Sequence, residues 1–403
     1  MTQEILVASS ATRSQTRSWR VRGRVVWLAV HRWVGLVLGA IFVVIGLTGA
    51  ILAFRQPLDE AINSSAVRVE PPKDGASRAS LDEIFRAAKA KMPRDAVATF
   101  LSMPRHPGAA VAISYRTFDD EGAATSRKIY VDPYRAVVTG DELIKVGDDE
   151  IRQAPTNSLL SLHRSLWLGS NYSYLVGTAA ILLLLSMIFG VVLWWPRPGQ
   201  WSLAFKIKPG ASAERRIFDL HRVFGAAFVG ILCMSLFTGA YMTFRSTVRD
   251  AVRLFSPVRE APHLVSTPII GKEPIGLDDA ARIAGAVFPN GKLISISLPT
   301  GDRGVYVAGE RTDDEPSRTF SRNRVTIDRY SGETLYVEDR ATYSAGERFL
   351  EWLRPLHTGE AFGNVGRTII LATGLMTAFL YVTGFVRWRQ RRRNLAAPSR
   401  RQA

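Results

Sequence analysis

The sequence is poor in cysteine and histidine, and both shortages limit what the chain can be. Its one cysteine, Cys233, cannot form a disulfide within the chain, so any large part outside the cytoplasm has to fold without one. No Cys-x-x-Cys-His segment is present, which excludes attachment of a c-type haem. A glycine-rich dinucleotide fingerprint is also absent, so we do not expect this chain to bind flavin or NAD(P)H itself.

Basic residues outnumber acidic residues, and the segments that contain the extra basic residues indicate what the charge is for. The chain has 52 Lys and Arg against 36 Asp and Glu, which gives a net charge of +16. Such a charge fits nucleic acid, a membrane surface or positive cytoplasmic loops. The basic residues gather in segments 1–24, 196–216 and 388–403, beside long apolar runs, and no nucleic-acid motif is present. The charge therefore indicates membrane topology, and no nucleic-acid partner is expected.

Four apolar runs are long enough to cross a lipid bilayer, which takes about 20 residues. They occupy residues 25–54, 173–195, 217–245 and 367–387. The first run is too long for a signal peptide and lacks a clean cleavage site, so we expect it to remain as a span. The sequence therefore predicts a polytopic membrane protein with an α-helical bundle of four spans.

The three basic segments lie on one side of the membrane if there are four spans. Because cytoplasmic loops carry the excess of Lys and Arg, that side is the cytoplasm, together with both chain termini. The two long connections, 55–172 and 246–366, then lie outside. In each we predict an α+β lobe, in which a helix at 80–93 or 276–289 packs on a small antiparallel sheet.

The second half of the chain repeats the pattern of the first. An offset of 190 residues aligns His31 with His221, and an offset of 194 aligns His163 with His357. The same offsets align further residue pairs: Arg32 with Arg222, Gly35 with Gly225, Gly49 with Gly239, Gly190 with Gly384 and Trp194 with Trp388. We therefore predict a parallel internal duplication about an axis along the membrane normal.

Four of the six histidines stand at equivalent places beside the spans. His31 and His221 lie near the cytoplasmic ends of the first and third spans, and His163 and His357 lie just before the second and fourth. Two imidazoles that face each other across the axis can take both axial positions of one haem iron. We therefore predict two b-type haems, an inner one on His31 and His221 and an outer one on His163 and His357.

Other residues near the spans have two interpretations each. Arg32 and Arg222 could bind haem propionates on the cytoplasmic side and Arg164 outside, or all three could be charged anchors at the membrane surface. The glycines could leave room for a porphyrin or allow helices to pack closely. His106 and His263 have no repeat partner and are predicted to lie on the surface.

Two segments resemble the signature segments of PepSY-associated transmembrane proteins. They are residues 30–59, VHRWVGLVLGAIFVVIGLTGAILAFRQPLD, and residues 161–197, SLHRSLWLGSNYSYLVGTAAILLLLSMIFGVVLWWPR. DLHRVFG and LRPLHTG in the second half fit the same pattern, and the resemblance covers about residues 24–390. It implies a bacterial inner membrane, PepSY-like periplasmic lobes and the same four histidine ligands. Thr358 stands where the second motif has Arg164.

One branch of this family is similar to ferrioxamine-type di-haem ferric-siderophore reductases. That resemblance implies an oxidoreductase that carries electrons outward and reduces Fe(III) siderophores to Fe(II) in the periplasm. Because no nucleotide site is expected, the electron donor would be a quinol or an external reductase. Arg105, Arg116, Arg303 and Tyr134 are candidates for siderophore docking. The alternative is a haem-free regulator whose PepSY lobes bind or inhibit a periplasmic peptidase.

Overall fold

A computed structural model of the 403-residue chain describes residues 2–73 and 77–396. It divides into two compact units. The helical unit comprises residues up to 51, 172–244 and 368 onward, and the sheet unit comprises 52–171 and 245–367. Of the predicted basic tails, residue 1 and residues 397–403 lie outside the described residues, as do the side chains of 2–22.

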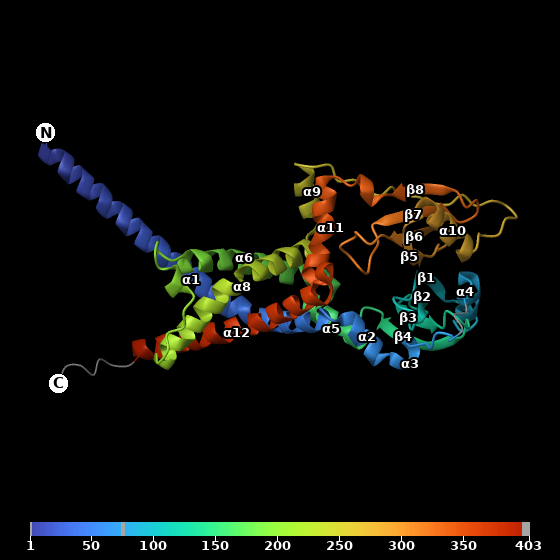
Figure 1. Ribbon diagram of the computed structural model, residues 1–403, viewed down its shortest axis with the longest axis horizontal. Coiled ribbons are helices and arrows are strands. Elements are labelled where there is room, and N and C mark those ends of the chain that lie inside the picture. The colour runs from blue at the N-terminus through green and yellow to red at the C-terminus, as the bar shows by residue number, and fades with distance from the viewer. Residues whose placement is uncertain (1, 74–76, 397–403) are drawn as a thin grey trace. The chain divides into compact units, whose positions relative to one another are not determined.

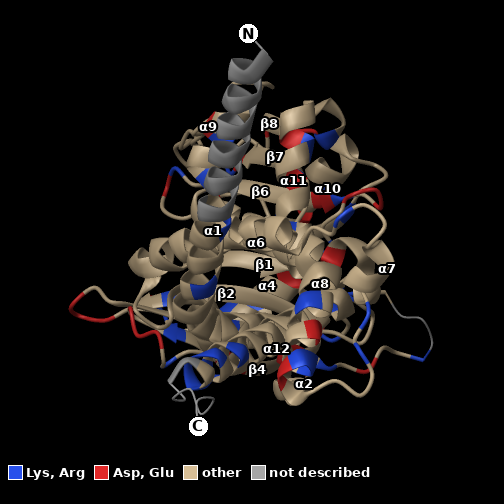
Figure 2. Ribbon diagram, turned by 90° about the vertical axis from the view of Figure 1, so that its left-hand side faces the viewer, with Lys and Arg blue, Asp and Glu red and all other residues tan. Residues whose placement is uncertain are grey.

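The helical unit consists of four long helices that run side by side (Figure 1). They are α1 (Thr2–Leu52), α6 (Ser173–Trp194), α8 (Ala213–Thr243) and α12 (Gly363–Ala396), with the short α7 (Trp201–Ala204) between α6 and α8. Each of the four contains a stretch long and apolar enough to cross a membrane, which confirms the four predicted spans. Basic residues gather at the start of α8 and in the last turns of α12 (Figure 2).

Glycine allows two of these helices to touch. A Cβ atom on Gly46 of α1 would lie 3.0 Å from the carbonyl oxygen of Gly374 on α12. A Cβ on Gly374 would lie only 2.2 Å from the carbonyl oxygen of Gly46. The close-packing interpretation of the span glycines is therefore correct for Gly46, because any larger side chain at this crossing would push the backbones apart.

The sheet unit is built on one antiparallel sheet of eight strands in the order β4-β3-β2-β1-β5-β6-β7-β8. The strands are β1 (Val97–Ser102), β2 (Val111–Phe118), β3 (Ala124–Val131), β4 (Val138–Val146), β5 (Lys292–Ser297), β6 (Val305–Arg311), β7 (Asn323–Asp328) and β8 (Thr334–Glu338). The halves join where β1 pairs with β5, with Leu101 opposite Ile296. The sequence predicted two lobes with a small sheet each. The two halves instead share a single sheet, because β1, the first strand of one half, pairs with β5, the first strand of the other.

One hydrophobic core also serves both halves. Helices α4 (Leu81–Lys89) and α10 (Leu277–Val287), at the two positions where lobe helices were predicted, contribute Ile84, Ala88, Ala280 and Ala284 to it. Alternate residues of the central strands, together with Leu298 just after β5, complete this core: Leu101, Val111, Ile113, Tyr115, Ile129, Val131, Ile296, Tyr306, Ala308, Val325 and Ile327. Since side chains alternate across a strand, the residues between these face the other side of the sheet.

The remaining helices of the sheet unit include the two that carry His163 and His357. They are α2 (Arg55–Ile62), α3 (Ser64–Val67), α5 (Pro155–Ser165), α9 (Arg245–Arg253) and α11 (Ala345–Thr358), with short 3-10 helices η1 (Ser170–Tyr172), η2 (Arg340–Thr342) and η3 (Glu360–Phe362). Helix α5 ends because Leu166 and Trp167 adopt left-handed backbone conformations, with φ of 55° and 60°. The histidine-bearing α5 is therefore a separate helix from the span α6.

Candidate functional site

His31 of α1 and His221 of α8 face each other inside the helical unit. Their ring centroids are 6.4 Å apart and their planes cross at 70°. Both side chains are half-buried. The structure therefore brings together the first pair of histidines that the sequence analysis matched.

Each of these rings is held from behind by a neighbouring helix. Nδ1 of His31 lies 2.8 Å from the carbonyl oxygen of Ser186 on α6, and Nδ1 of His221 lies 3.1 Å from that of Leu380 on α12. A carbonyl oxygen only accepts hydrogen bonds, so Nδ1 donates and carries the proton. The lone pair then resides on Nε2, which is the arrangement that a metal-binding histidine requires.

Hydroxyl groups reinforce both contacts. The Ser186 hydroxyl lies 3.3 Å from Nδ1 of His31, and the Thr383 hydroxyl lies 3.0 Å from Nδ1 of His221. Ser186 and Thr383 are buried. Neither residue was predicted from the sequence. The sequence does contain one related pattern. A glycine stands four positions after each residue whose carbonyl oxygen accepts from a histidine: Gly190 after Ser186, and Gly384 after Leu380.

These two glycines leave the room that the histidine rings occupy. A Cβ atom on Gly190 would lie 2.8 Å from Cε1 of His31, and one on Gly384 would lie 3.4 Å from Cε1 of His221. The first distance is shorter than non-bonded carbon atoms tolerate, and the second is tight. Gly190 and Gly384 therefore serve to admit the imidazole rings against the helix backbone.

Arg222 has partners within the helical unit. Its guanidinium lies 3.1 Å from the fully buried Asp219 and donates to the carbonyl oxygens of Leu203 and Lys206, at 3.2 and 2.8 Å. It thereby connects α7 and the segment after it to α8. This geometry favours the anchoring interpretation for Arg222, while its contact with a propionate stays a prediction.

The other two arginines are placed differently. The guanidinium of Arg32 lies 5.5 Å from the ring centre of Trp33, and its Nε is buried without a hydrogen-bond partner among the described residues. Arg164 is exposed on α5. These positions fit both interpretations of Arg32 and Arg164, which are binding of a haem propionate and a charged anchor at the membrane surface.

His163 of α5 and His357 of α11 form the second facing pair, within the sheet unit. Their ring centroids are 6.2 Å apart and their planes cross at 57°. Both histidines lie in the last turn of their helices. His106 and His263 are exposed, as predicted, and His106 lies 3.3 Å from Glu60.

The separation within each pair can be compared with what a shared iron requires. A metal–imidazole bond of about 2 Å, with the ring centre about 1.2 Å behind the nitrogen, places the centres of two rings on opposite sides of one metal about 6.4 Å apart. The measured separations of 6.4 and 6.2 Å fit this value. In the described part of the chain, no group of three or more His, Cys, Asp or Glu side chains could hold a metal ion.

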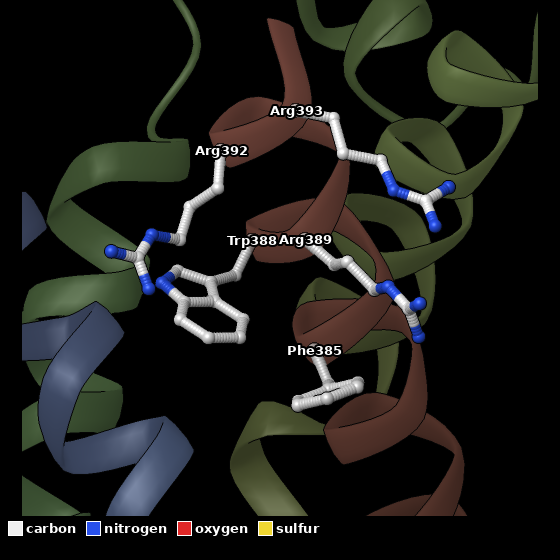
Figure 3. A pocket seen from close by; sticks show the side chains of 5 residues that line it. All are labelled: Phe385, Trp388, Arg389, Arg392 and Arg393. Atoms are coloured by element: carbon white, nitrogen blue, oxygen red, sulfur yellow. The ribbon is translucent and has the colours of Figure 1, made fainter. Parts of the chain in front are cut away.

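A surface pocket of about 530 Å³ lies along the basic end of α12. Figure 3 shows its lining, which consists of Phe385, Trp388, Arg389, Arg392 and Arg393. The guanidinium of Arg392 lies 5.4 Å from the ring centre of Trp388. Aromatic and basic side chains combined in this way are typical of a span end at a membrane surface.

Comparison with known proteins places this arrangement in a family. An uncharacterized protein of Pseudomonas aeruginosa, PA4219, is 29% identical over 258 residues, which are 58% of this chain and 63% of that protein. The match thus spans less than two thirds of that relative's length. A family model described as the PepSY-associated TM region matches residues 28–391, which include all four paired histidines. The chain therefore belongs to the PepSY-associated transmembrane family.

Proposed function

We propose that this protein is a di-haem electron-transfer protein of the bacterial inner membrane that reduces ferric siderophores in the periplasm. The observation that supports it most strongly is the pair of facing histidines, present twice, at 6.4 and 6.2 Å between ring centroids. Each pair suits one b-type haem with two axial imidazoles. The proposal assigns His31 and His221 to an inner haem and His163 and His357 to an outer one.

The topology belongs to the same proposal. Both chain termini and the segment between α6 and α8 lie in the cytoplasm, because basic residues mark these segments. The connections that form the sheet unit then lie in the periplasm. The two halves descend from a parallel duplication, which is supported by the matching order of helix and strands on the two sides of the β1–β5 junction.

The chain's own residues would orient the cofactors and fix the protonation state of the histidine rings that bind them. A bound haem supplies a reversible one-electron change at its iron. The carbonyl groups of Ser186 and Leu380 hold the protons on Nδ1 of His31 and His221, so that both Nε2 atoms keep a lone pair. Gly190 and Gly384 let the rings lie against the helix backbone and so limit their rotation.

The proposed reaction requires one electron for each iron. A siderophore holds Fe(III) with hard oxygen ligands, and one added electron gives Fe(II), which these ligands hold less tightly. The iron is reduced, and a quinol or a separate reductase is oxidised as the electron donor. No bond to the protein forms or breaks, so the chain needs only a donor, a path for electrons and a surface for the chelate.

The test begins with the cofactor and continues with the substrate. Protein purified from haem-replete cells should contain two b-type haems per chain by pyridine haemochrome. After anaerobic reduction with dithionite, addition of a ferric siderophore with a ferrous-iron trap should reoxidise the haem in step with trapped Fe(II). Protein in which His263, an exposed and unpaired residue, is replaced (His263→Ala) is the matched control and should behave as the wild type.

Two results would overturn the proposal. Protein without haem would remove the electron-transfer function and leave the regulator of a periplasmic peptidase as the better candidate. Haem that stays reduced with both hydroxamate and catecholate siderophores would exclude siderophore reduction while keeping a redox role.

A further inference from the structure

The pocket at the end of α12 combines aromatic rings with guanidinium groups. The ring centroids of Phe385 and Trp388 are 5.6 Å apart, and the guanidinium of Arg392 lies 5.4 Å from the ring centre of Trp388, within the range of a cation–π contact. In Figure 3 the side chains of Arg389 and Arg393 extend to the same side of α12, above Phe385. A ligand in this pocket would therefore meet positive charge and apolar surface together.

The arginines of the pocket lack acidic partners. Arg392 and Arg393 follow Arg389 by three and four residues, so the three are neighbours on the helix surface and repel one another. Among the described residues, no carboxylate forms an ion pair or a hydrogen bond with any of them. The sequence after Glu360 contains no Asp or Glu at all. A counter-charge cannot come from α12 itself.

The neighbouring helix does not supply a counter-charge either. The acidic side chains that the structure describes in the helical unit are Glu214 and Asp219, both on α8. Glu214 accepts from the amide of Asn394 at 3.2 Å. Asp219 lies 3.0 Å from Arg215 and 3.1 Å from Arg222. Both carboxylates are thus engaged elsewhere, and the charge of the pocket is left for an anion from outside the chain.

The apolar face of the span leads directly to these arginines. Val382, Phe385, Arg389 and Arg393 follow one another at intervals of three and four residues, which places them on one face of α12. Val382 is 56% exposed, Phe385 is 38% exposed, and Leu375, two turns before Val382, is 51% exposed. This face therefore offers an apolar surface along the span and two guanidinium groups at its end.

We propose that this face of α12 is a binding site for one anionic phospholipid. The headgroup phosphate lies between Arg389 and Arg393, and an acyl chain lies along Phe385 and Val382. Guanidinium groups bind phosphate oxygens by charge-assisted hydrogen bonds, and basic pockets at the ends of spans recognise anionic headgroups. A soluble anion would use the arginines but leave the apolar face uncovered. The site requires neither haem nor siderophore, so it does not rest on the proposed function.

The test compares two lipids that differ only in headgroup charge. The purified full-length protein in detergent is titrated with phosphatidylglycerol or with phosphatidylcholine of the same acyl chains, and native mass spectrometry measures binding of the first lipid molecule. The wild type should prefer phosphatidylglycerol. Arg389→Gln/Arg393→Gln should bind phosphatidylglycerol more weakly by a factor of about ten or more, with phosphatidylcholine binding unchanged. A double variant that keeps the wild-type preference would overturn the site.

Matched variants separate a site from a general attraction to positive charge. Arg216→Gln/Arg391→Gln removes two exposed charges from α8 and α12 outside the pocket and should keep the preference. Arg389→Lys/Arg393→Lys retains both charges and should keep most of it. If the Arg216 and Arg391 variant loses the preference as fully as the pocket variant, the arginines act only through net charge and the site is wrong.

Two further measurements address other anions. Glycerol 3-phosphate, which has the phosphate but no acyl chain, should not displace the bound lipid, and displacement would show that the pocket takes soluble anions instead. Haem content by pyridine haemochrome should be the same in Arg389→Gln/Arg393→Gln as in the wild type, and loss of a haem would assign the arginines to propionates. A protein without haem can still show the lipid preference, so failure of this site and failure of the proposed function are distinguishable.

Discussion

Asp82 and Asp278 cap each other's helices across the junction between the two halves of the sheet unit. The carboxylate of Asp278 accepts from the backbone N–H groups of Leu81 and Asp82 at the start of α4, at 2.8 and 3.1 Å. The carboxylate of Asp82 accepts from those of Leu277 and Asp278 at the start of α10, at 2.7 and 3.4 Å. The first N–H groups of a helix have no acceptor within the helix. Each half of the chain therefore supplies the acceptor for the first turn of the other half's helix.

The two carboxyl groups differ in how firmly they hold a proton. Burial, together with the neighbouring Asp278, raises the pKa of Asp82. Burial also works to raise the pKa of Asp278, but the N–H groups of Leu81 and Asp82 outweigh it and lower that pKa. Folding therefore favours the ionised form of Asp278 and disfavours the ionised form of Asp82.

This difference predicts unequal effects of asparagine at the two positions. Asp82→Asn should destabilise the protein less than Asp278→Asn at pH 7, because the raised pKa of Asp82 means that folding disfavours its ionised form. Asp278→Asn removes the charge that faces the start of α4 and should destabilise the protein by about 1 kcal/mol. Thermal unfolding in detergent at pH 7 measures the stability of both variants against the wild type. Equal losses from the two variants would contradict the assignment of the charge.

The same pair predicts how stability changes with pH. The raised pKa of Asp82 contributes stability below its unfolded value, and this is lost as the pH rises through the folded value. The lowered pKa of Asp278 contributes stability at higher pH that is lost in acid. Relative to the wild type, Asp82→Asn should therefore gain stability as the pH is raised from 4 to 8.

Replacement of single histidines tests the pairing. His31→Ala and His221→Ala should remove the same spectral component, because one iron loses an axial ligand in both. His163→Ala and His357→Ala should remove the other component and stop siderophore reduction, while the inner haem remains reducible. Low-temperature absorption spectra of the four variants supply the comparison. If His31→Ala and His163→Ala were to remove one component together, the pairing would be wrong.

The two glycines beside the inner pair should differ in their tolerance of alanine. Gly190→Ala places a methyl carbon 2.8 Å from Cε1 of His31, so the ring has to move and the inner haem should be lost or its spectrum altered. Gly384→Ala leaves 3.4 Å to His221, so its effect should be smaller. Gly35→Ala is the matched control, since no atom lies within 4 Å of the added carbon. Equal effects at all three positions would show that ring contact is not the cause.

Glu310 predicts a second pH dependence, located in the sheet unit. It is 2% exposed, and burial raises its pKa to about 7. A raised carboxyl pKa contributes stability that is present below the unfolded value and is lost as the pH rises through about 7. Relative to the wild type, Glu310→Gln should therefore gain about 3 kcal/mol of stability between pH 5 and pH 9. Chemical unfolding at pH 5 and pH 9 measures the free energy of unfolding of the variant and the wild type. An equal difference between the two proteins at both pH values would contradict the prediction.

Much of this protein follows from the sequence by itself. The four spans and both lobe helices were predicted near their observed positions, because hydropathy and helical periodicity are properties of neighbouring residues. The pairing of His31 with His221 and of His163 with His357 was also predictable. Offsets of 190 and 194 residues align these histidines in the sequence, and each aligned pair lies close together in the structure.

Other features depended on the tertiary structure. The pairing of β1 with β5 was not predicted, because an edge strand has the same alternating pattern whether it is free or paired. The hydrogen bonds from Nδ1 of His31 and His221 involve backbone carbonyls, which every residue possesses and no sequence pattern distinguishes.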